Sequence, residues 1–120
     1  MILKPWGSEE VLAHTEAYKI KILTIRSGCQ TSLQFHRYRK EKVMLLCGEA
    51  ILERKVPPGE TNMRTHFENL PVAFTYTVEK NTIHRLRNPG RFPAKILEVQ
   101  FGEILDDNDI ERLEDDYGRA

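Results

Sequence analysis

The chain has 120 residues, the length of one domain, and a domain of this size buries roughly two thirds of the surface that its unfolded chain exposes. Hydrophobic residues make up 40% and charged residues 30% of the chain, a balance typical of a soluble globular protein and not of a disordered one. No apolar run approaches the roughly 20 residues that span a bilayer, and the start Met-Ile-Leu-Lys-Pro-Trp-Gly is not typical of a secretory signal. We therefore expect one domain over residues 1–120 that stays in the cytoplasm and does not contact a membrane.

The charges balance overall but are unevenly distributed along the chain. Residues 1–97 carry 16 basic and 9 acidic side chains, whereas residues 98–120 carry 2 basic and 9 acidic ones. Either the acidic tail folds back and neutralises the basic body, or a basic cleft remains that attracts an anion such as a sugar phosphate. No long Lys/Arg run with interleaved aromatic residues is present, so nucleic acid is not an expected partner.

Short runs of β-forming residues recur between turn residues. The expected strands cover residues 18–26, 31–36, 42–47, 49–54, 73–78, 83–87 and 94–101. Strands of this length, spaced by roughly 8–12 residues, predict a β-sandwich or a β-barrel. From Asp106 onward the pattern changes, and Asp107 or Asn108 is expected to cap a short helix that runs to about Glu114.

Alternation within two of these strands separates a polar face from an apolar one. The polar residues are Ser32, Gln34, His36, Glu98 and Gln100, and the apolar ones are Leu33, Phe35, Leu97, Val99 and Phe101. The polar faces either line a small lumen or face solvent, since the alternation permits both. If they line a lumen, the apolar faces need cover from the N-terminal segment, the C-terminal helix or a second subunit, and we expect a homodimer.

One group of residues has the types and the spacing of a metal site. It reads Gly28-x5-Gln34-x-His36-x4-Glu41-x6-Gly48, followed downstream by His84-x3-Asn88. Gln34 and His36 lie two residues apart and so project together. Two imidazole nitrogens and two oxygens suit Zn²⁺, Mn²⁺, Fe²⁺, Co²⁺ or Ni²⁺ better than Ca²⁺ or Mg²⁺. Taken singly, each residue also has an ordinary explanation as a hydrogen-bonded histidine or a surface charge.

The whole pattern resembles the two histidine motifs of the cupin superfamily, with Gln34 in place of the first histidine. Within the cupins it resembles the type II phosphomannose isomerase domain, which also forms the C-terminal part of bifunctional mannose-1-phosphate guanylyltransferase/isomerase enzymes and has glutamine at this place. The matching segments are Lys4-Pro-Trp-Gly-Ser8, Tyr18-Lys-Ile-Lys21, Ser32-Leu-Gln-Phe-His36, Arg39-x-Glu41, His84-Arg-Leu-Arg-Asn-Pro-Gly90, Leu97-Glu-Val-Gln-x-Gly102, Asp109-Ile-x-Arg112 and Tyr117-Gly-Arg119. The resemblance implies an all-β fold, the cupin double-stranded β-helix or jelly-roll barrel, with a short C-terminal helix.

The resemblance also implies an activity, the metal-dependent interconversion of mannose 6-phosphate and fructose 6-phosphate, and a place in polysaccharide biosynthesis. The implied metal ligands, for Zn²⁺ first among the divalent ions, are Gln34, His36, Glu41 and His84, and the family's functional arginines fall on Arg39, Arg112 and Arg119. An aldose–ketose isomerase also needs a base that titrates near neutral pH. Glu98 is our candidate because a lumen raises the pKa of a carboxyl group, and Lys21 or Lys42 could serve if desolvated.

The chain departs from the family's motif at several positions. Where the family typically has Gln-Met-His-His-His-Arg-Ala-Glu-His-Trp, this chain has arginine at 37, tyrosine at 38 and Lys42 in place of a histidine to which the family assigns a part in catalysis. Before the second motif, Glu79 and Asn81 replace proline and glycine. Two alternatives to the isomerase therefore stay open: a metal-binding or sugar-binding cupin without turnover, and another cupin enzyme, such as one that acts on a sugar nucleotide or an Fe²⁺ dioxygenase.

Overall fold

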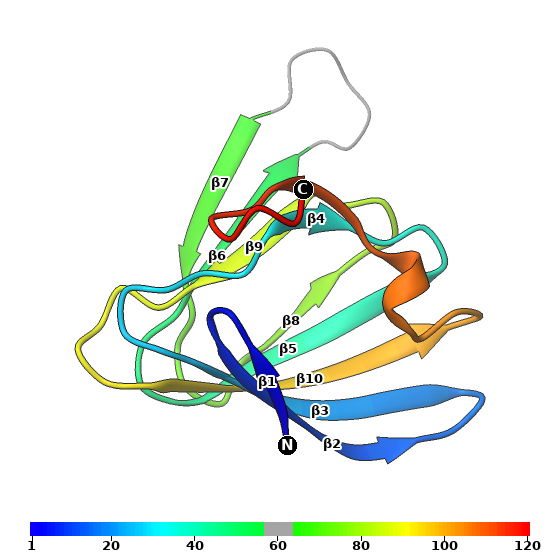
Figure 1. The fold of residues 1–120 in the computed structure, drawn as a ribbon, viewed down its shortest axis with the longest axis horizontal. Coiled ribbons are helices and arrows are strands. Elements are labelled where there is room, and N and C mark those ends of the chain that lie inside the picture. The colour runs from blue at the N-terminus through cyan, green and yellow to red at the C-terminus, as the bar shows by residue number, and fades with distance from the viewer. Residues whose placement is uncertain (57–63) are drawn as a thin grey trace.

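The computed structural model describes residues 1–56 and 64–120, and these residues form almost entirely β-structure (Figure 1). The strands, in chain order, are β1 (Ile2–Lys4), β2 (Gly7–His14), β3 (Tyr18–Ile25), β4 (Leu33–Phe35), β5 (Arg39–Cys47), β6 (Ile51–Val56), β7 (Arg64–Asn69), β8 (Thr75–Val78), β9 (His84–Arg87), β10 (Ala94–Gly102) and β11 (Glu111–Glu114). A 3-10 turn, η1 (Asp107–Asp109), precedes β11. Across these two ranges, no helix is long and apolar enough to cross a membrane.

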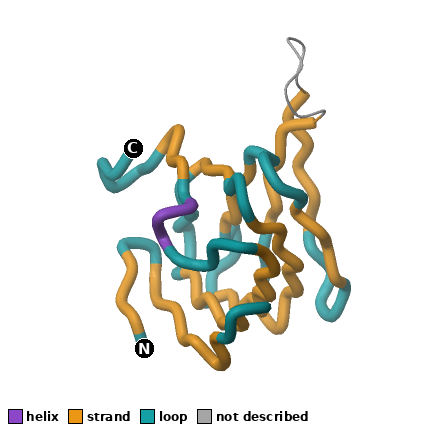
Figure 2. Tube along the Cα trace, turned by 90° about the vertical axis from the view of Figure 1, so that its right-hand side faces the viewer, coloured by secondary structure: helices purple, strands orange, loops and turns teal. Residues whose placement is uncertain are grey.

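The strands form two antiparallel sheets. One sheet has the order β1-β2-β3-β10-β5-β8, and the other has the order β11-β4-β9-β6-β7. In Figure 1 the first sheet lies in the lower half of the molecule, and the second lies above it. β10 lies between β3 and β5 and pairs with both along almost its whole length, although the three strands are far apart in sequence. Both ends of the chain lie on one side of the barrel, at the left of Figure 2.

The inward faces of the central strands change from apolar to polar along their length. The buried residues are Leu45, Val43, Glu41 and Arg39 on β5, and Ala94, Ile96, Glu98 and Gln100 on β10. The register aligns the polar ends, because Gln100 pairs with Glu41, and Glu98 pairs with Lys21 of β3. The interior therefore has an apolar end and a polar end, and the polar faces line the interior, one of the two arrangements that alternation permits.

The apolar end is a compact core. It consists of Trp6, Leu23, Ile25, Val43, Leu45, Ala50, Leu52, Leu70, Val78, Leu86, Ala94 and Ile96. A large apolar side chain gains about 1.5–3 kcal/mol when it is fully buried, so this cluster supplies much of the stability that holds the polar end in place. Tyr117, near the C-terminus, packs against the same cluster and ties the end of the chain to it.

Each of the seven expected strand segments contains a strand, but the expected C-terminal helix is wrong. η1 covers only three residues, and its cap is Asp106, whose side chain accepts a hydrogen bond from the Asn108 amide at 2.9 Å. Ile110 then has extended backbone angles, and Glu111–Glu114 form β11, which pairs with β4. The pairing satisfies backbone groups at the edge of β4, which a helix at this place would leave open.

Candidate metal centre

Three strands, β4 and β9 of the second sheet and β5 of the first, bring the predicted ligands to the polar end of the barrel. His36 follows β4, Glu41 lies on β5 and His84 begins β9, and all three side chains are buried. One ligand atom from each lies within 4.8 Å of the others. Gln34 pairs with His84 in the register of β4 and β9, and it lines the same pocket. The structure thus brings the four predicted ligands to one pocket.

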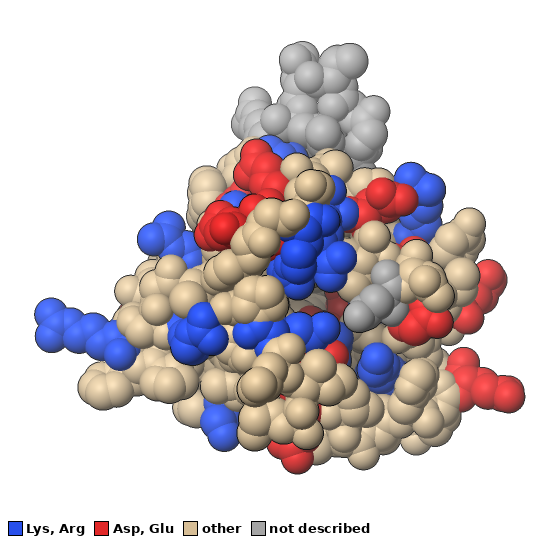
Figure 3. Space-filling model, in the orientation of Figure 1, with Lys and Arg blue, Asp and Glu red and all other residues tan. Residues whose placement is uncertain are grey.

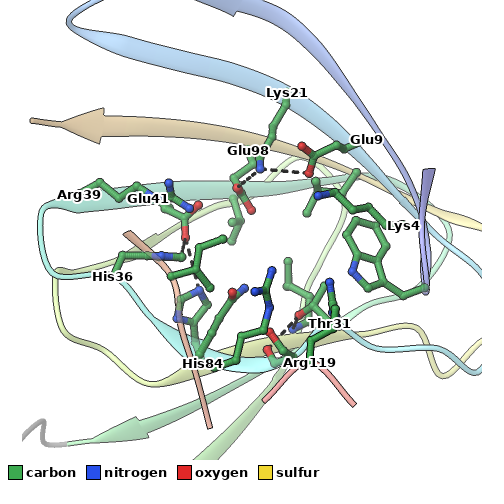
Figure 4. A pocket seen from close by; sticks show the side chains of 18 residues that line it. Lys4, Glu9, Lys21, Thr31, His36, Arg39, Glu41, His84, Glu98 and Arg119 are labelled. Atoms are coloured by element: carbon green, nitrogen blue, oxygen red, sulfur yellow. Dashed lines mark hydrogen bonds and ion pairs between the residues drawn. The ribbon is translucent and has the colours of Figure 1, made fainter. Parts of the chain in front are cut away.

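The two imidazole rings face one oxygen of Glu41. Glu41 Oε1 lies 2.8 Å from His36 Nε2 and 3.4 Å from His84 Nε2 (Figure 4). On the far side of each ring, Nδ1 lies within hydrogen-bond distance of a backbone carbonyl, 2.7 Å from Asp109 O for His36 and 2.8 Å from Thr82 O for His84. A carbonyl can only accept, so Nδ1 carries a hydrogen in both rings. Nε2 presents a lone pair to a metal ion once the hydrogen that it can donate to Glu41 is lost. Two such nitrogens and a carboxylate oxygen fit a divalent ion of the zinc type.

A second carboxylate, Glu98, is linked to Glu41 through Gln100. The Gln100 amide donates to Glu41 Oε2 at 2.8 Å and to Glu98 Oε1 at 2.7 Å, and its side chain is fully buried. Burial, followed by the charge of Glu41, raises the pKa of Glu98 to about 8. Burial also acts to raise the pKa of Glu41, but hydrogen bonds from the two histidines outweigh it and hold that pKa well below its usual range. The two neighbouring carboxyl groups are therefore driven to different protonation states.

Lys21 lies between Glu98 and a further buried carboxylate, Glu9 of β2. Its Nζ atom is 3.2 Å from Glu9 Oε2 and 3.7 Å from Glu98 Oε1, as the dashed lines of Figure 4 show. Burial alone would lower the pKa of Lys21, but the attraction of Glu98 and Glu9 outweighs it and raises the pKa. Lys21 is therefore held as an ammonium ion, which makes it a charge partner of Glu98 and not a base.

The three arginines implied by the family resemblance all line the pocket. Arg39 donates to the backbone oxygen of Asp106 at 3.0 Å, and Arg119 forms two hydrogen bonds to Asp115 at 2.8 and 2.9 Å. Five cationic and three acidic side chains line this pocket. On the face shown in Figure 3, Lys and Arg side chains gather around a hollow near the middle of the molecule. A surplus of positive charge around a hollow favours an anionic ligand.

Lys42 is not brought to the pocket. It lies on β5 next to Glu41, and because side chains alternate along a strand it is exposed on the opposite face. The role that the sequence indicated for Lys42 is therefore not retained. Positions 37 and 38, where the chain lacks two of the family's histidines, are exposed as well. The substitutions at these three positions leave the residues that line the pocket unchanged.

The replacement of glycine by Asn81 also preserves the local structure. Asn81 has a φ of 64°, in the left-handed region that glycine favours and asparagine tolerates. Its amide donates to the backbone oxygen of His36 at 2.7 Å. The turn that leads into His84 therefore keeps the conformation that it needs and contacts the other histidine of the site.

Sequence reasoning did not assign a role in the site to Lys4, Glu9, Gln100 or Asp109. Lys4 and Glu9 come from β1 and β2, for which no strand was expected. Gln100 lies two residues after Glu98 on β10, so strand alternation places it on the same inward face and could have indicated a role in the site. Asp109 stands in the segment Asp109-Ile-x-Arg112, but nothing in that spacing indicates that its backbone would contact His36.

Comparison with known proteins finds relatives by sequence and by fold. The family model described as mannose-6-phosphate isomerase C-terminal matches residues 1–115. The alginate biosynthesis protein AlgA of Pseudomonas putida is 36% identical over 121 residues, which cover 99% of this chain and 23% of AlgA. The xanthan biosynthesis protein XanB of Xanthomonas campestris is 33% identical over 121 residues, covering 99% of this chain and 24% of XanB. The chain thus spans about a quarter of the length of these relatives.

A solved structure with the same fold is the capsular polysaccharide assembling protein CapF from Staphylococcus aureus. It matches with a TM-score of 0.77 at 16% sequence identity, over 93% of this chain and 31% of CapF. At 16% sequence identity, the similarity to CapF shows the fold alone. The expected fold, an all-β cupin barrel of two antiparallel sheets, is confirmed, without its expected C-terminal helix.

Proposed function

The chain belongs to the mannose-6-phosphate isomerase C-terminal family, and from this premise we propose that it is a metal-dependent isomerase that interconverts mannose 6-phosphate and fructose 6-phosphate. The observation that carries the proposal is the convergence of His36, Glu41 and His84 beside Glu98, in a pocket with more cationic than acidic side chains. A metal group, a proton-transfer group and a site for an anion are the three parts that this reaction requires.

The reaction moves a proton between C1 and C2 of the sugar while negative charge develops on a carbonyl oxygen. A divalent ion held by His36, Glu41 and His84, with Zn²⁺ as our first choice, would act as a Lewis acid. In typical metal enzymes such an ion stabilises the charge of the transition state by several kcal/mol. Glu98 takes up the proton and returns it, which suits a carboxyl group with a pKa of about 8. The ammonium of Lys21, 3.7 Å from Glu98, stabilises the negative form of that carboxyl group.

The phosphate would be bound by the arginines that line the pocket. Among the described residues, the buried Nε atoms of Arg39 and Arg112 have no hydrogen-bond partner. A guanidinium group offers a phosphate two parallel N–H donors, so an incoming phosphate would satisfy groups that are otherwise left unpaired. We assign Arg39 and Arg112 this role, with Arg119 and Lys4 at the rim.

We further propose that the activity serves the synthesis of polysaccharide precursors in the cytoplasm. Support comes from the names of the relatives AlgA and XanB, which are biosynthesis proteins for alginate and xanthan. Because the chain matches only about a quarter of each relative, the activity of the whole relatives is not carried over to it.

The experiment is a coupled assay for fructose 6-phosphate, with the full chain loaded in turn with Zn²⁺, Co²⁺ or Mn²⁺ and supplied with mannose 6-phosphate. We expect turnover that His84→Ala removes together with metal binding. Glu98→Gln should lower kcat by about 10²–10⁴-fold while metal content stays at the wild-type level, because it removes the proton acceptor and not a ligand. His66→Ala, at an exposed histidine on β7, is the matched control and should behave as wild type.

One observation favours the second candidate, a metal-binding cupin without turnover. The pocket offers a volume of about 50 Å³, which is room for an ion and one or two waters at about 30 Å³ each. Ligand pockets of enzymes are typically about 300–1,000 Å³, so a sugar phosphate requires the pocket to widen. Stoichiometric metal with no turnover on mannose 6-phosphate would favour this candidate and contradict the isomerase.

A further inference from the structure

The segment after β10 crosses the polar end of the barrel and contacts His36 of the metal centre. Asp109, at the end of η1, is 5% exposed, although its side chain is a carboxylate. Its two carboxylate oxygens accept hydrogen bonds from successive backbone amides, Oδ1 from Arg37 at 2.8 Å and Oδ2 from Tyr38 at 3.0 Å. These amides belong to the turn between β4 and β5 that directly follows His36. The side chain of Asp109 therefore fastens the C-terminal segment to this turn.

The backbone of the same residue holds the His36 ring. The carbonyl oxygen of Asp109 lies 2.7 Å from His36 Nδ1, although the two residues are 73 positions apart in sequence. This contact fixes the hydrogen on Nδ1 and turns Nε2 toward Glu41, 2.8 Å away. The carboxylate and the carbonyl of Asp109 act together. The two hydrogen bonds from the Arg37 and Tyr38 amides to the carboxylate fix the position of the carbonyl relative to the His36 ring.

The two histidines of the site are held in different ways. His84 Nδ1 contacts the carbonyl of Thr82, only two residues earlier in the same turn, so its orientation depends on local structure. His36 depends on a segment that joins the barrel from the far end of the chain. Groups that hold metal-ligating histidines typically account for about 10–100-fold in metal affinity. Because His36 is held by a residue of the C-terminal segment, the metal affinity depends on whether that segment is docked on the barrel.

We propose that Asp109 is a positioning residue of the metal centre, which orients His36 and makes the affinity for a divalent ion depend on docking of the C-terminal segment. This inference rests on the metal centre of the proposed function, but not on turnover. Its new elements are Asp109 and the amides of Arg37 and Tyr38, which neither the metal nor the sugar has to contact.

The test uses the full chain freed of metal with a chelator and titrated with Co²⁺, whose absorption spectrum reports the geometry of its ligands. Asp109→Asn keeps the oxygen that faces the Arg37 amide but presents an NH₂ group to the Tyr38 amide, and Asp109→Ala removes both acceptors. We expect Co²⁺ affinity to fall about tenfold in the first variant and up to about a hundredfold in the second, with an altered spectrum. Glu111→Gln is the control, because it removes the same charge and an exposed ion pair to Arg37 at 3.7 Å, and it should bind Co²⁺ as wild type does.

A measurement on the wild-type protein keeps the proposal falsifiable even if both Asp109 variants fail to fold. Nitrogen NMR of the metal-free chain with ¹⁵N-labelled histidine reports which ring nitrogen of His36 carries hydrogen, and we expect Nδ1. Hydrogen on Nε2 alone would overturn the proposal, as would wild-type Co²⁺ affinity and spectrum in both variants. A wild-type chain that binds Co²⁺ without isomerising mannose 6-phosphate contradicts the proposed function and leaves the role of Asp109 supported, whereas one that binds no Co²⁺ contradicts both.

Discussion

Lys21 lies between two buried carboxyl groups and is the counter-ion of Glu9 and of the ionised form of Glu98. Its Nζ atom lies 3.2 Å from Glu9 and 3.7 Å from Glu98, and all three side chains are buried. Removing one member of a buried ionic group typically costs about 3–5 kcal/mol, because the remaining charge stays in a medium of low polarity. We expect Lys21→Met to lower the free energy of unfolding in urea by this amount, and Lys21→Met combined with Glu9→Gln to recover part of it.

The pH dependence of this effect has a definite sign. The pKa of Lys21 is higher in the folded protein than the usual value of 10.5, so its stabilising contribution is complete below that value and is lost as the pH rises through the folded pKa. Wild type should therefore lose more stability than Lys21→Met when the pH is raised above 10.5. Equal losses in both proteins would show that the ammonium does not stabilise the fold.

Only part of the site could be predicted from residue patterns. The inward position of Glu98 follows from strand alternation, and His36, Glu41 and His84 follow from their spacing. Asp109 could not be found in this way, because it contacts His36 through a backbone carbonyl, a group that every residue has, and its side chain contacts only backbone amides. Glu9 was missed because the strand that carries it was not expected, and Lys42 was misjudged because adjacent residues of a strand point to opposite faces.

At the scale of elements, strands rich in apolar and β-branched residues were predicted, and the more polar β2 and β7 were not. β3 and β10 have apolar residues on both faces, whereas β2 and β7 are largely exposed and carry several charged or polar residues. In the C-terminal segment, the acidic residues that suggest the first turn of a helix also fit a capped 3-10 turn followed by an edge strand. The choice between them depends on β4, about 75 residues earlier in the sequence, which supplies the partner for pairing.

The two glycines of the first motif differ in how tightly they are enclosed, and this difference can be measured. Gly48, in the turn between β5 and β6, has a φ of 85°, and an added Cβ would lie 2.8 Å from the Pro93 oxygen and 2.9 Å from Ala94 Cα. Gly28 has a φ of 73°, but nothing lies within 4 Å of an added Cβ.

We therefore expect Gly28→Ala to cost about 1 kcal/mol from backbone strain alone and Gly48→Ala about 2–4 kcal/mol from strain and overlap together. Urea denaturation of both variants checks this ordering. Equal costs would mean that the turn after β5 can move away from β10, and the account of Gly48 as a close contact would be wrong.

At the scale of the whole molecule, the expectation of a homodimer now depends on only one part of the apolar surface that suggested it, the part on β10. Leu33 was expected to need cover from outside, but it is only 4% exposed within a single chain. The outer face of the six-stranded sheet, by contrast, carries a short apolar row that includes Leu97, with Glu10 and Lys42 beside it. Ile22 pairs with Leu97, which pairs with Met44, and in the next row Ile20 pairs with Val99.

These side chains are half-buried by one another, and in a single chain their outer surfaces meet solvent. We propose that a second copy of the chain packs on this face, since a two-fold axis brings the same apolar patch of both chains together and removes it from water. Light scattering at micromolar concentration should give about twice the 14.0 kDa mass of one chain.

Leu97→Glu, at the centre of the row, should give a monomer, because it buries a charge at the interface without a partner. Phe92→Glu, at a side chain 75% exposed outside the sheets, removes comparable apolar surface and should leave the dimer intact. A wild-type protein with the mass of one chain would contradict the dimer while leaving the metal centre, whose ligands all come from one chain, unaffected.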